Sequence, residues 1–208
     1  MKISRAIVLG LTIVLGAPFA VAAGDAAAGK GAYAVCAACH GPSGEGNVAM
    51  RAPRLAGQGG WYIERQLKSF QAGHRGSKPG DSDGMQMRGL AMSVSSPEAM
   101  ANLIAYIETL PAKASATTVQ GDAAAGKTLY MTCGACHGQN AEGSEQMGGP
   151  RLAGLDDWYI VRQLKNFKGG LRGSDPADTF GRQMAPMAAV LADDAAINNV
   201  VAYINSLQ

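Results

Sequence analysis

The sequence DAAAGKGAYAVCAACHG at residues 25–41 returns 97 positions later as DAAAGKTLYMTCGACHG at residues 122–138, with 12 of 17 residues identical. A second block, APRLAGQGGWYIERQLKSF at residues 52–70, returns as GPRLAGLDDWYIVRQLKNF at residues 149–167, with 13 of 19 identical. The offset is the same in both blocks, so no insertion or deletion separates the copies. A period this long is too large for a solenoid unit and indicates a duplicated domain.

The ends of the two copies divide the chain. We expect a first domain at residues 24–110, a linker at residues 111–119 and a second domain at residues 120–208. The linker is rich in Pro, Ala and Thr and has no apolar periodicity. Because it is short, we expect the two domains to touch.

Residues 1–23 read as a signal peptide. Lys2 and Arg5 precede an apolar run, and small residues follow it, so we expect cleavage after Ala22 or Ala23. The run is short for a bilayer span, which favours removal over the alternative of a retained anchor. The sequence therefore predicts export, with the mature protein in the periplasm.

Composition and charge exclude several classes of protein. Of the 208 residues, 47% are hydrophobic and 16% charged, so the chain is neither disordered nor membrane-embedded as a whole. The formal charge of +2 equals the contribution of Lys2 and Arg5, and the two domains carry 8 − 7 = +1 and 7 − 9 = −2. With no basic stripe, nucleic-acid binding has no electrostatic support. Aromatic residues make up only 6%, so we expect a bound group to fill part of each core.

Both copies read as helical, and the fold class that we predict is all-α. Asp25 and Asp122 are placed as N-caps of a first helix that runs into a cysteine motif. Residues 61–70 space apolar side chains along one helical face, and a Ser-Pro pair opens a last helix near residue 96. We expect the Gly- and Ser-rich stretches 71–94 and 168–190 to be loops.

All four cysteines belong to two C-x-x-C-H motifs, a pattern typical of covalent c-type haem attachment. Two thiols three positions apart can each form a thioether to one porphyrin edge, and the following histidine is carried to the iron. The residues are Cys36, Cys39, His40, Cys133, Cys136 and His137. Half of a zinc site, a redox dithiol and a structural disulfide are the alternatives. A zinc site would lack a fourth ligand in each copy, and a redox dithiol lacks its βαβ context. A disulfide does not explain a histidine after both cysteine pairs.

The repeat offset also selects candidates for the second axial ligand. Met87 maps onto Met184, each 47 residues past its histidine, whereas the neighbours Met85 and Met92 map onto residues that are not methionine. Thioether sulfur is a soft ligand that favours ferrous iron and raises its reduction potential. We therefore expect His40 and Met87 to ligate one iron, and His137 and Met184 the other. Met50 with Met147, and Met187 alone, are the rivals.

Other recurring residues suggest supporting roles. The carbonyls of Pro53 and Pro150 could accept a hydrogen bond from the histidine of their own copy, although both are also ordinary turn prolines. The recurring arginines could face haem propionates or solvent, and the recurring tyrosines could pack where the first and last helices cross. These are Arg54, Arg151, Tyr33, Tyr106, Tyr130 and Tyr203.

Together these features resemble class I cytochromes c, and the tandem arrangement behind a signal peptide resembles the di-haem cytochrome c4 family. The resemblance covers essentially the whole chain after residue 23. It implies two covalently attached, low-spin haem c groups with His/Met ligation, in domains that place the haems near each other. It also implies a periplasmic electron carrier that takes electrons from a quinol-oxidising complex and delivers them to a terminal oxidase or reductase.

We therefore expect a carrier rather than an enzyme, and a monomer, with peripheral membrane association in some members of the family. Two alternatives stay open on the sequence: a di-haem peroxidase-like enzyme, which needs an open iron position, and a dedicated donor subunit of a membrane oxidase complex.

Overall fold

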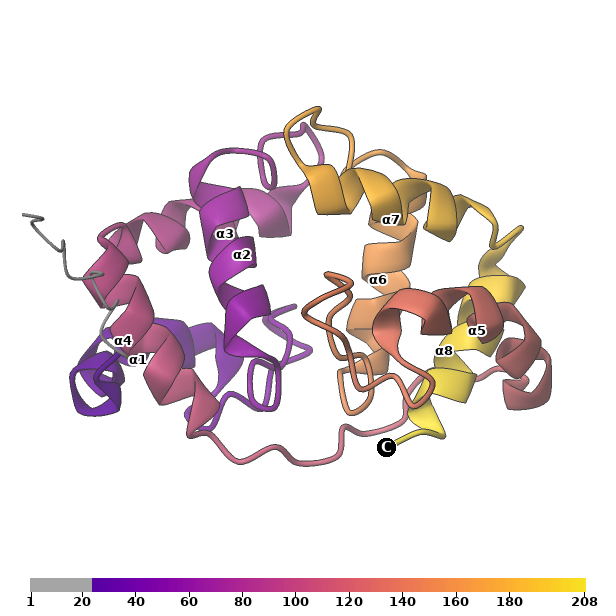
Figure 1. Cartoon of the computed structure of the whole chain (residues 1–208), viewed down its shortest axis with the longest axis horizontal. Helices are drawn as coiled ribbons and strands as arrows, with labels where there is room; N and C mark the ends of the chain where they lie inside the picture. The colour runs from indigo at the N-terminus through magenta and orange to yellow at the C-terminus, as the bar shows by residue number, and fades with distance from the viewer. Residues whose placement is uncertain (1–23) are drawn as a thin grey trace, which may run out of the picture.

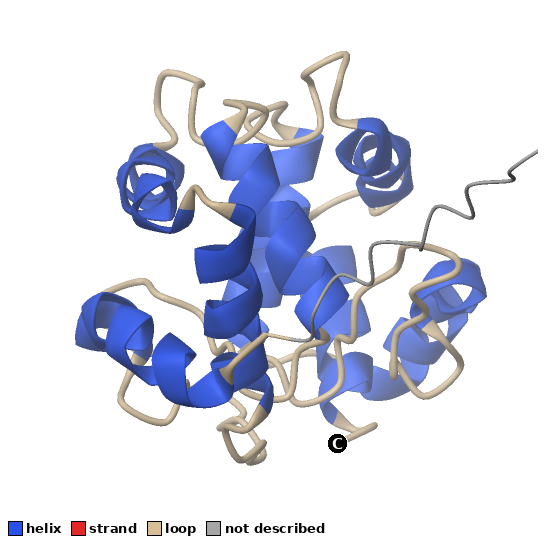
Figure 2. Ribbon diagram, turned by 60° about the vertical axis from the view of Figure 1, so that its left-hand side comes forward, coloured by secondary structure: helices blue, strands red, loops and turns tan. Residues whose placement is uncertain are grey.

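The computed structural model describes residues 24–208, so the expected signal peptide lies outside the described residues. The chain forms two helical lobes that lie side by side, joined by a segment that runs along one edge of the molecule (Figure 1). Within residues 24–208 the structure contains no strand, and two isolated bridges are its only β pairing (Figure 2). The predicted all-α fold class is confirmed.

The two lobes repeat the same order of helices. The first contains α1 (Ala26–His40), α2 (Gly60–Gln71), α3 (Ser82–Ala91), the short 3₁₀ helix η1 (Met92–Val94) and α4 (Pro97–Glu108). The second contains α5 (Ala123–His137), α6 (Asp157–Lys168), α7 (Thr179–Ala189) and α8 (Asp194–Asn205). No single helix among these is long and apolar enough to cross a membrane, although α7 and α8 would pass together as a pair bent by 113°.

The predicted helix starts are confirmed. The Asp25 side chain caps α1 by accepting hydrogen bonds from the amides of Ala27 and Ala28. Asp122 caps α5 in the same way, through the equivalent two amides. The Ser96 side chain accepts from the Ala99 amide at the start of α4, where Pro97 occupies the first helical position.

In each lobe the first helix crosses the last helix at close range. The rings of Tyr33 and Tyr106 lie 5.2 Å apart at this crossing, and those of Tyr130 and Tyr203 lie 5.3 Å apart in the second lobe, as predicted. A Cβ atom on Gly29 of α1 would lie only 1.9 Å from a backbone oxygen of α4. Glycine at this position therefore sets how closely the two helices approach.

The expectation of loops at residues 71–94 and 168–190 is wrong over about half of each stretch, because α3 and α7 lie there. Each helix begins at an aspartate whose carboxylate accepts from a backbone amide three residues later, Asp81 from Gly84 and Asp178 from Gly181. The caps stabilise the starts of both helices, although α3 contains two glycines and α7 contains Pro186. Both aspartates are visible in the sequence as cap candidates, but the prediction followed the Gly, Pro and Ser content of the two stretches.

The segment between the lobes is held by hydrogen bonds. The buried carboxylate of Asp157 accepts from the amides of Thr118 and Val119 and from the Thr118 hydroxyl. The side chain of Arg54, in the first lobe, donates to the carbonyl of Lys113. These contacts fix the segment against both lobes.

Candidate functional site

One cavity of about 330 Å³ extends across both lobes and is lined by both C-x-x-C-H motifs. Its walls are mainly apolar side chains of the two cores. In the first lobe these include Leu55, Ile63, Leu67, Phe70, Val94, Leu103 and Ile107. In the second lobe they include Leu152, Ile160, Leu164, Phe167, Leu191, Val200 and Ile204. The two halves follow the repeat, so each lobe contributes an equivalent apolar chamber.

The motif residues reach this cavity because each motif occupies the end of the first helix of its lobe. Both α1 and α5 end on the histidine, and the next residue is a glycine with a φ of 83° that turns the chain away. Among residues 24–208 the four cysteines are free thiols, three of them partly buried and Cys136 exposed. The same residues contain no cluster of three His, Cys, Asp or Glu able to hold a metal ion, so the zinc alternative has no geometric support.

The two histidines are oriented by their own copy's proline. His40 Nδ1 lies 2.6 Å from the Pro53 carbonyl oxygen, and His137 Nδ1 lies 2.8 Å from that of Pro150, as the sequence suggested. Because a carbonyl can only accept, Nδ1 must carry the proton, which leaves Nε2 with a free lone pair. Burial lowers the pKa of both histidines, against the opposing effect of the carbonyls, and so favours the neutral imidazole that binds a metal.

Met87 and Met184 both line the cavity, from α3 and α7. Both are partly buried, whereas Met85 and Met92 are 50% and 54% exposed. The rivals Met50, Met147 and Met187 also border the cavity, and the first two are about half exposed. The structure thus brings the expected residues to one cavity, and burial separates Met87 from its two neighbours.

The recurring arginines after the prolines both donate to backbone carbonyls, but only Arg54 is buried. Arg54 is buried and donates to the Lys113 carbonyl, while exposed Arg151 donates from Nε to the Ala153 carbonyl.

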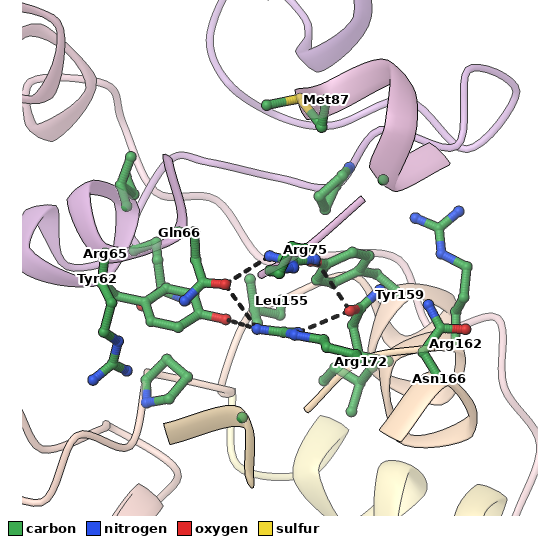
Figure 3. A pocket seen from close by; sticks show the side chains of 18 of the residues that line it. Tyr62, Arg65, Gln66, Arg75, Met87, Leu155, Tyr159, Arg162, Asn166 and Arg172 are labelled. Atoms are coloured by element: carbon green, nitrogen blue, oxygen red, sulfur yellow. Dashed lines mark hydrogen bonds between the residues drawn. The ribbon is translucent and has the colours of Figure 1, made fainter. Parts of the chain in front are cut away.

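A second pair of arginines, Arg75 and Arg172, occupies the centre of the contact between the lobes and was not predicted from the sequence. Both are buried, and they are equivalent in the repeat. They share the Oε1 atoms of Gln66 and Gln163, and Arg172 also donates to the Tyr62 hydroxyl at 3.1 Å (Figure 3). Burial and the positive charge of Arg172 lower the pKa of Arg75.

Within residues 24–208 no carboxylate forms an ion pair with these arginines, and Arg172 Nε has no hydrogen-bond partner. Burial lowers the pKa of Arg172, but Tyr62, Tyr159 and the more distant charge of Asp178 raise it overall. Two adjacent buried cations without a direct ion-pair partner are unfavourable, so an anionic group would be stabilised at this site. Haem c meets this requirement, because it combines an apolar macrocycle for the chambers with two carboxylates for the arginines. Free thiols and an unprotonated Nε2 complete the donor set, so the residues present fit the group.

Comparison with known proteins agrees with this chemistry. The family model for cytochrome c matches residues 26–111 and again residues 123–208. A cytochrome c4 from Azotobacter vinelandii is 37% identical over 178 residues, covering 79% of this chain and 82% of the relative. A thiosulfate dehydrogenase electron acceptor from Thiomonas intermedia is 35% identical, covering 78% of this chain and 76% of the relative.

The fold comparison gives the same result. The crystal structure of reduced recombinant cytochrome c4 from Pseudomonas stutzeri matches with a TM-score of 0.67 and 30% identity. The match covers 89% of this chain and 100% of that one.

Proposed function

The chain belongs to the cytochrome c4 family of di-haem electron carriers, and from this premise we propose that it passes electrons from a quinol-oxidising complex toward a terminal oxidase or reductase. It holds two covalently bound haem c groups. Each iron supplies a one-electron couple when the haem is bound. The residues of this chain hold each haem, occupy the iron positions that other ligands would need, and fix the two domains together.

The proposed attachment uses Cys36 and Cys39 in the first domain and the equivalent Cys133 and Cys136 in the second. His40 and His137 are the proposed proximal ligands, since each is oriented by a carbonyl at Nδ1 and presents Nε2 to the cavity. Met87 and Met184 are the proposed opposite ligands because they recur, are partly buried and line the cavity. We propose domain limits at residues 24–110 and 120–208, with 111–119 as the linker.

Methionine at the sixth position argues for a carrier over a peroxidase-like enzyme. A thioether bound to the iron blocks the position that peroxide would need. Each chamber also lacks a second histidine: of the three in the sequence, His40 and His137 serve as proximal ligands and His74 is absent from the cavity lining. Acid–base catalysis above the iron therefore has no evident residue.

Arg75 and Arg172 are the proposed partners of the haem propionates at the domain contact. They stand between the two chambers, where carboxylates from either haem would neutralise them (Figure 3). Such pairing would also tie each haem to the opposite domain and fix the distance that the electron crosses.

Export to the periplasm is part of this proposal and rests on residues 1–23. A periplasmic carrier would meet membrane complexes at their outer face. Because the net charge of this chain is small, docking there would depend on local surface charges rather than on long-range attraction. The relative from Thiomonas, a thiosulfate dehydrogenase electron acceptor, favours a second candidate donor, a dehydrogenase, in place of the quinol-oxidising complex.

The observation that carries the proposal is the single cavity shared by two equivalent haem chambers. To test it, the purified holoprotein is mixed with membranes that contain a quinol-oxidising complex and a quinol, and haem reduction is followed by absorbance. We expect catalytic reduction that an inhibitor of the complex abolishes, and reoxidation when oxidase-containing membranes and oxygen are added. Reduction by a thiosulfate dehydrogenase and thiosulfate, and not by the quinol-oxidising complex, would favour the second candidate.

A further inference from the structure

In both domains the histidine of the motif contacts a proline carbonyl, but the group that binds the following amide differs. In the first domain the Arg54 amide donates to Asp156 Oδ2 at 2.7 Å, and Asp156 belongs to the second domain. This carboxylate is only 7% exposed, and its other oxygen accepts from the Ser115 hydroxyl at 2.8 Å. The position equivalent to Asp156 is Gly59, which has no side chain to place against the second domain's histidine site.

The Asp156 contact is connected to the proximal ligand through one peptide group. The Pro53 carbonyl that accepts from His40 and the Arg54 amide that donates to Asp156 belong to the same peptide unit. A hydrogen-bonded chain therefore runs from the carboxylate, through the peptide, to the imidazole. Such chains polarise one another, and a carboxylate at the end makes the imidazole a stronger electron donor.

Each domain also receives one arginine from the other domain. Arg65 reaches into the second domain, where it donates to the Gly148 carbonyl at 2.6 Å and packs on the Phe180 ring at 4.0 Å. Its equivalent, Arg162, reaches into the first domain but forms an ion pair with Asp83 at 2.8 Å. Phe180 stands where Asp83 stands in the first domain, but Asp83 also pairs with Arg51 at 2.9 Å, and the equivalent of Arg51 is Gly148. These side chains therefore add no clear difference in charge, and Asp156 is the difference that remains.

The two sites therefore differ by one buried carboxylate. Asp156 lies against the peptide unit that holds His40, whereas the equivalent Gly59 carries no charge. The first site is thus the more negative of the two.

We propose that Asp156 is a positioning residue, lent by the second domain, that lowers the reduction potential of the haem in the first domain below that of its neighbour. A fixed negative charge, and a more basic imidazole, both favour ferric over ferrous iron. The inference rests on the proposed proximal role of His40. It gives the electron a downhill direction, from the first haem to the second.

The test is a redox titration of Asp156→Asn in the full-length holoprotein. Asparagine keeps the size of the side chain and an oxygen for the Arg54 amide, but removes the charge. The control Glu98→Gln removes the same charge from an exposed position on the first domain. Each haem is followed by NMR and assigned through its contacts with a core phenylalanine, Phe70 for the first domain and Phe167 for the second.

We expect Asp156→Asn to raise the ratio of reduced to oxidised iron at the first haem by about three- to tenfold at a given potential, up to ~59 mV for one electron. The ratio of reduced to oxidised iron should change by less than about twofold at the second haem, and at both haems of the Glu98→Gln protein. Equal shifts at both haems, or none, would overturn the proposal. If the variant does not fold with its haems, the two reduction potentials of the unaltered protein test the inference. A higher potential at the first haem than at the second would contradict it.

This outcome is separate from the proposed ligation. A wrong assignment of the methionine ligands appears in the unaltered protein as a missing sulfur-to-iron absorption band, and a wrong assignment of His40 appears as a haem spectrum that His40→Ala leaves unchanged, whichever way the potentials are ordered.

Discussion

Replacing Arg172 by methionine tests whether haem carboxylates neutralise the buried arginine pair. Methionine has a similar length and no charge. Arg75 would remain within hydrogen-bonding distance of both shared glutamine oxygens, at 2.6 and 3.4 Å, so the Tyr62 hydroxyl is the one acceptor that loses its partner. The hydrogen-bond loss should therefore be limited to about 1 kcal/mol.

Whether Arg172→Met stabilises or destabilises the fold then depends on whether a haem carboxylate pairs with the arginines. If no carboxylate pairs with the arginines, removing one of two adjacent buried cations should stabilise the fold, because the repulsion between them and one desolvation penalty are lost. If propionates pair with them, breaking that buried ion pair should destabilise the holoprotein by ~3–5 kcal/mol. We predict the second outcome, with a fall in the reduction potentials because a positive charge near the irons is lost.

The assay is equilibrium unfolding of the holoprotein in guanidinium chloride, followed by haem absorbance at neutral pH. Arg182→Met, at an exposed position of the same domain, is the control and should change stability by less than about 0.5 kcal/mol. A more stable Arg172→Met protein would refute the reasoning, because it would mean that the arginines have no anionic partner.

Three further variants test other parts of the account. Met87→Ala and Met184→Ala should each remove one of two contributions to the sulfur-to-iron absorption band of the ferric protein, and an intact band would reject the ligand assignment. Asp157→Ala should cost ~3 kcal/mol in thermal or denaturant unfolding, because linker amides lose a buried charged acceptor. Burial alone would raise the pKa of Asp157, but hydrogen bonds from the Thr118 hydroxyl and those amides lower it overall. The contribution of Asp157 to the free energy of unfolding is therefore present above an ordinary carboxyl pKa of ~4 and is lost as the pH falls below that value. The stability of wild type and variant should converge there, and a difference that persists at low pH would contradict this. Tyr33→Phe removes a 2.7 Å hydrogen bond to the C-cap carbonyl of α1 and should cost ~1 kcal/mol in the same unfolding assay, whereas no loss would show that ring packing alone matters.

The sequence was sufficient for the parts of the protein that depend on local signals and on the repeat. The caps at Asp25 and Asp122, the tyrosine pairs at the helix crossings and the histidine–proline contacts all recur at a fixed offset. The offset also separated Met87 from its neighbours, and the structure agrees in leaving Met85 and Met92 half exposed.

The features that were missed depend on how the two domains meet. Arg75 and Arg172 belong to no motif, and their importance appears only when the domain contact buries both side chains together. The difference between Gly59 and Asp156 was visible in the aligned copies. Its consequence was not, because only the fold places Asp156 against the peptide that holds the other domain's histidine.

The central claim is that this chain carries two closed, low-spin haems and transfers electrons without doing chemistry on a substrate. The most direct measurement is an anaerobic reductive titration of the purified holoprotein, followed by absorbance, before and after hydrogen peroxide is added. The account predicts two electrons per chain, low-spin spectra in both oxidation states, and no peroxide turnover. A high-spin iron in either state that turns over peroxide would contradict it.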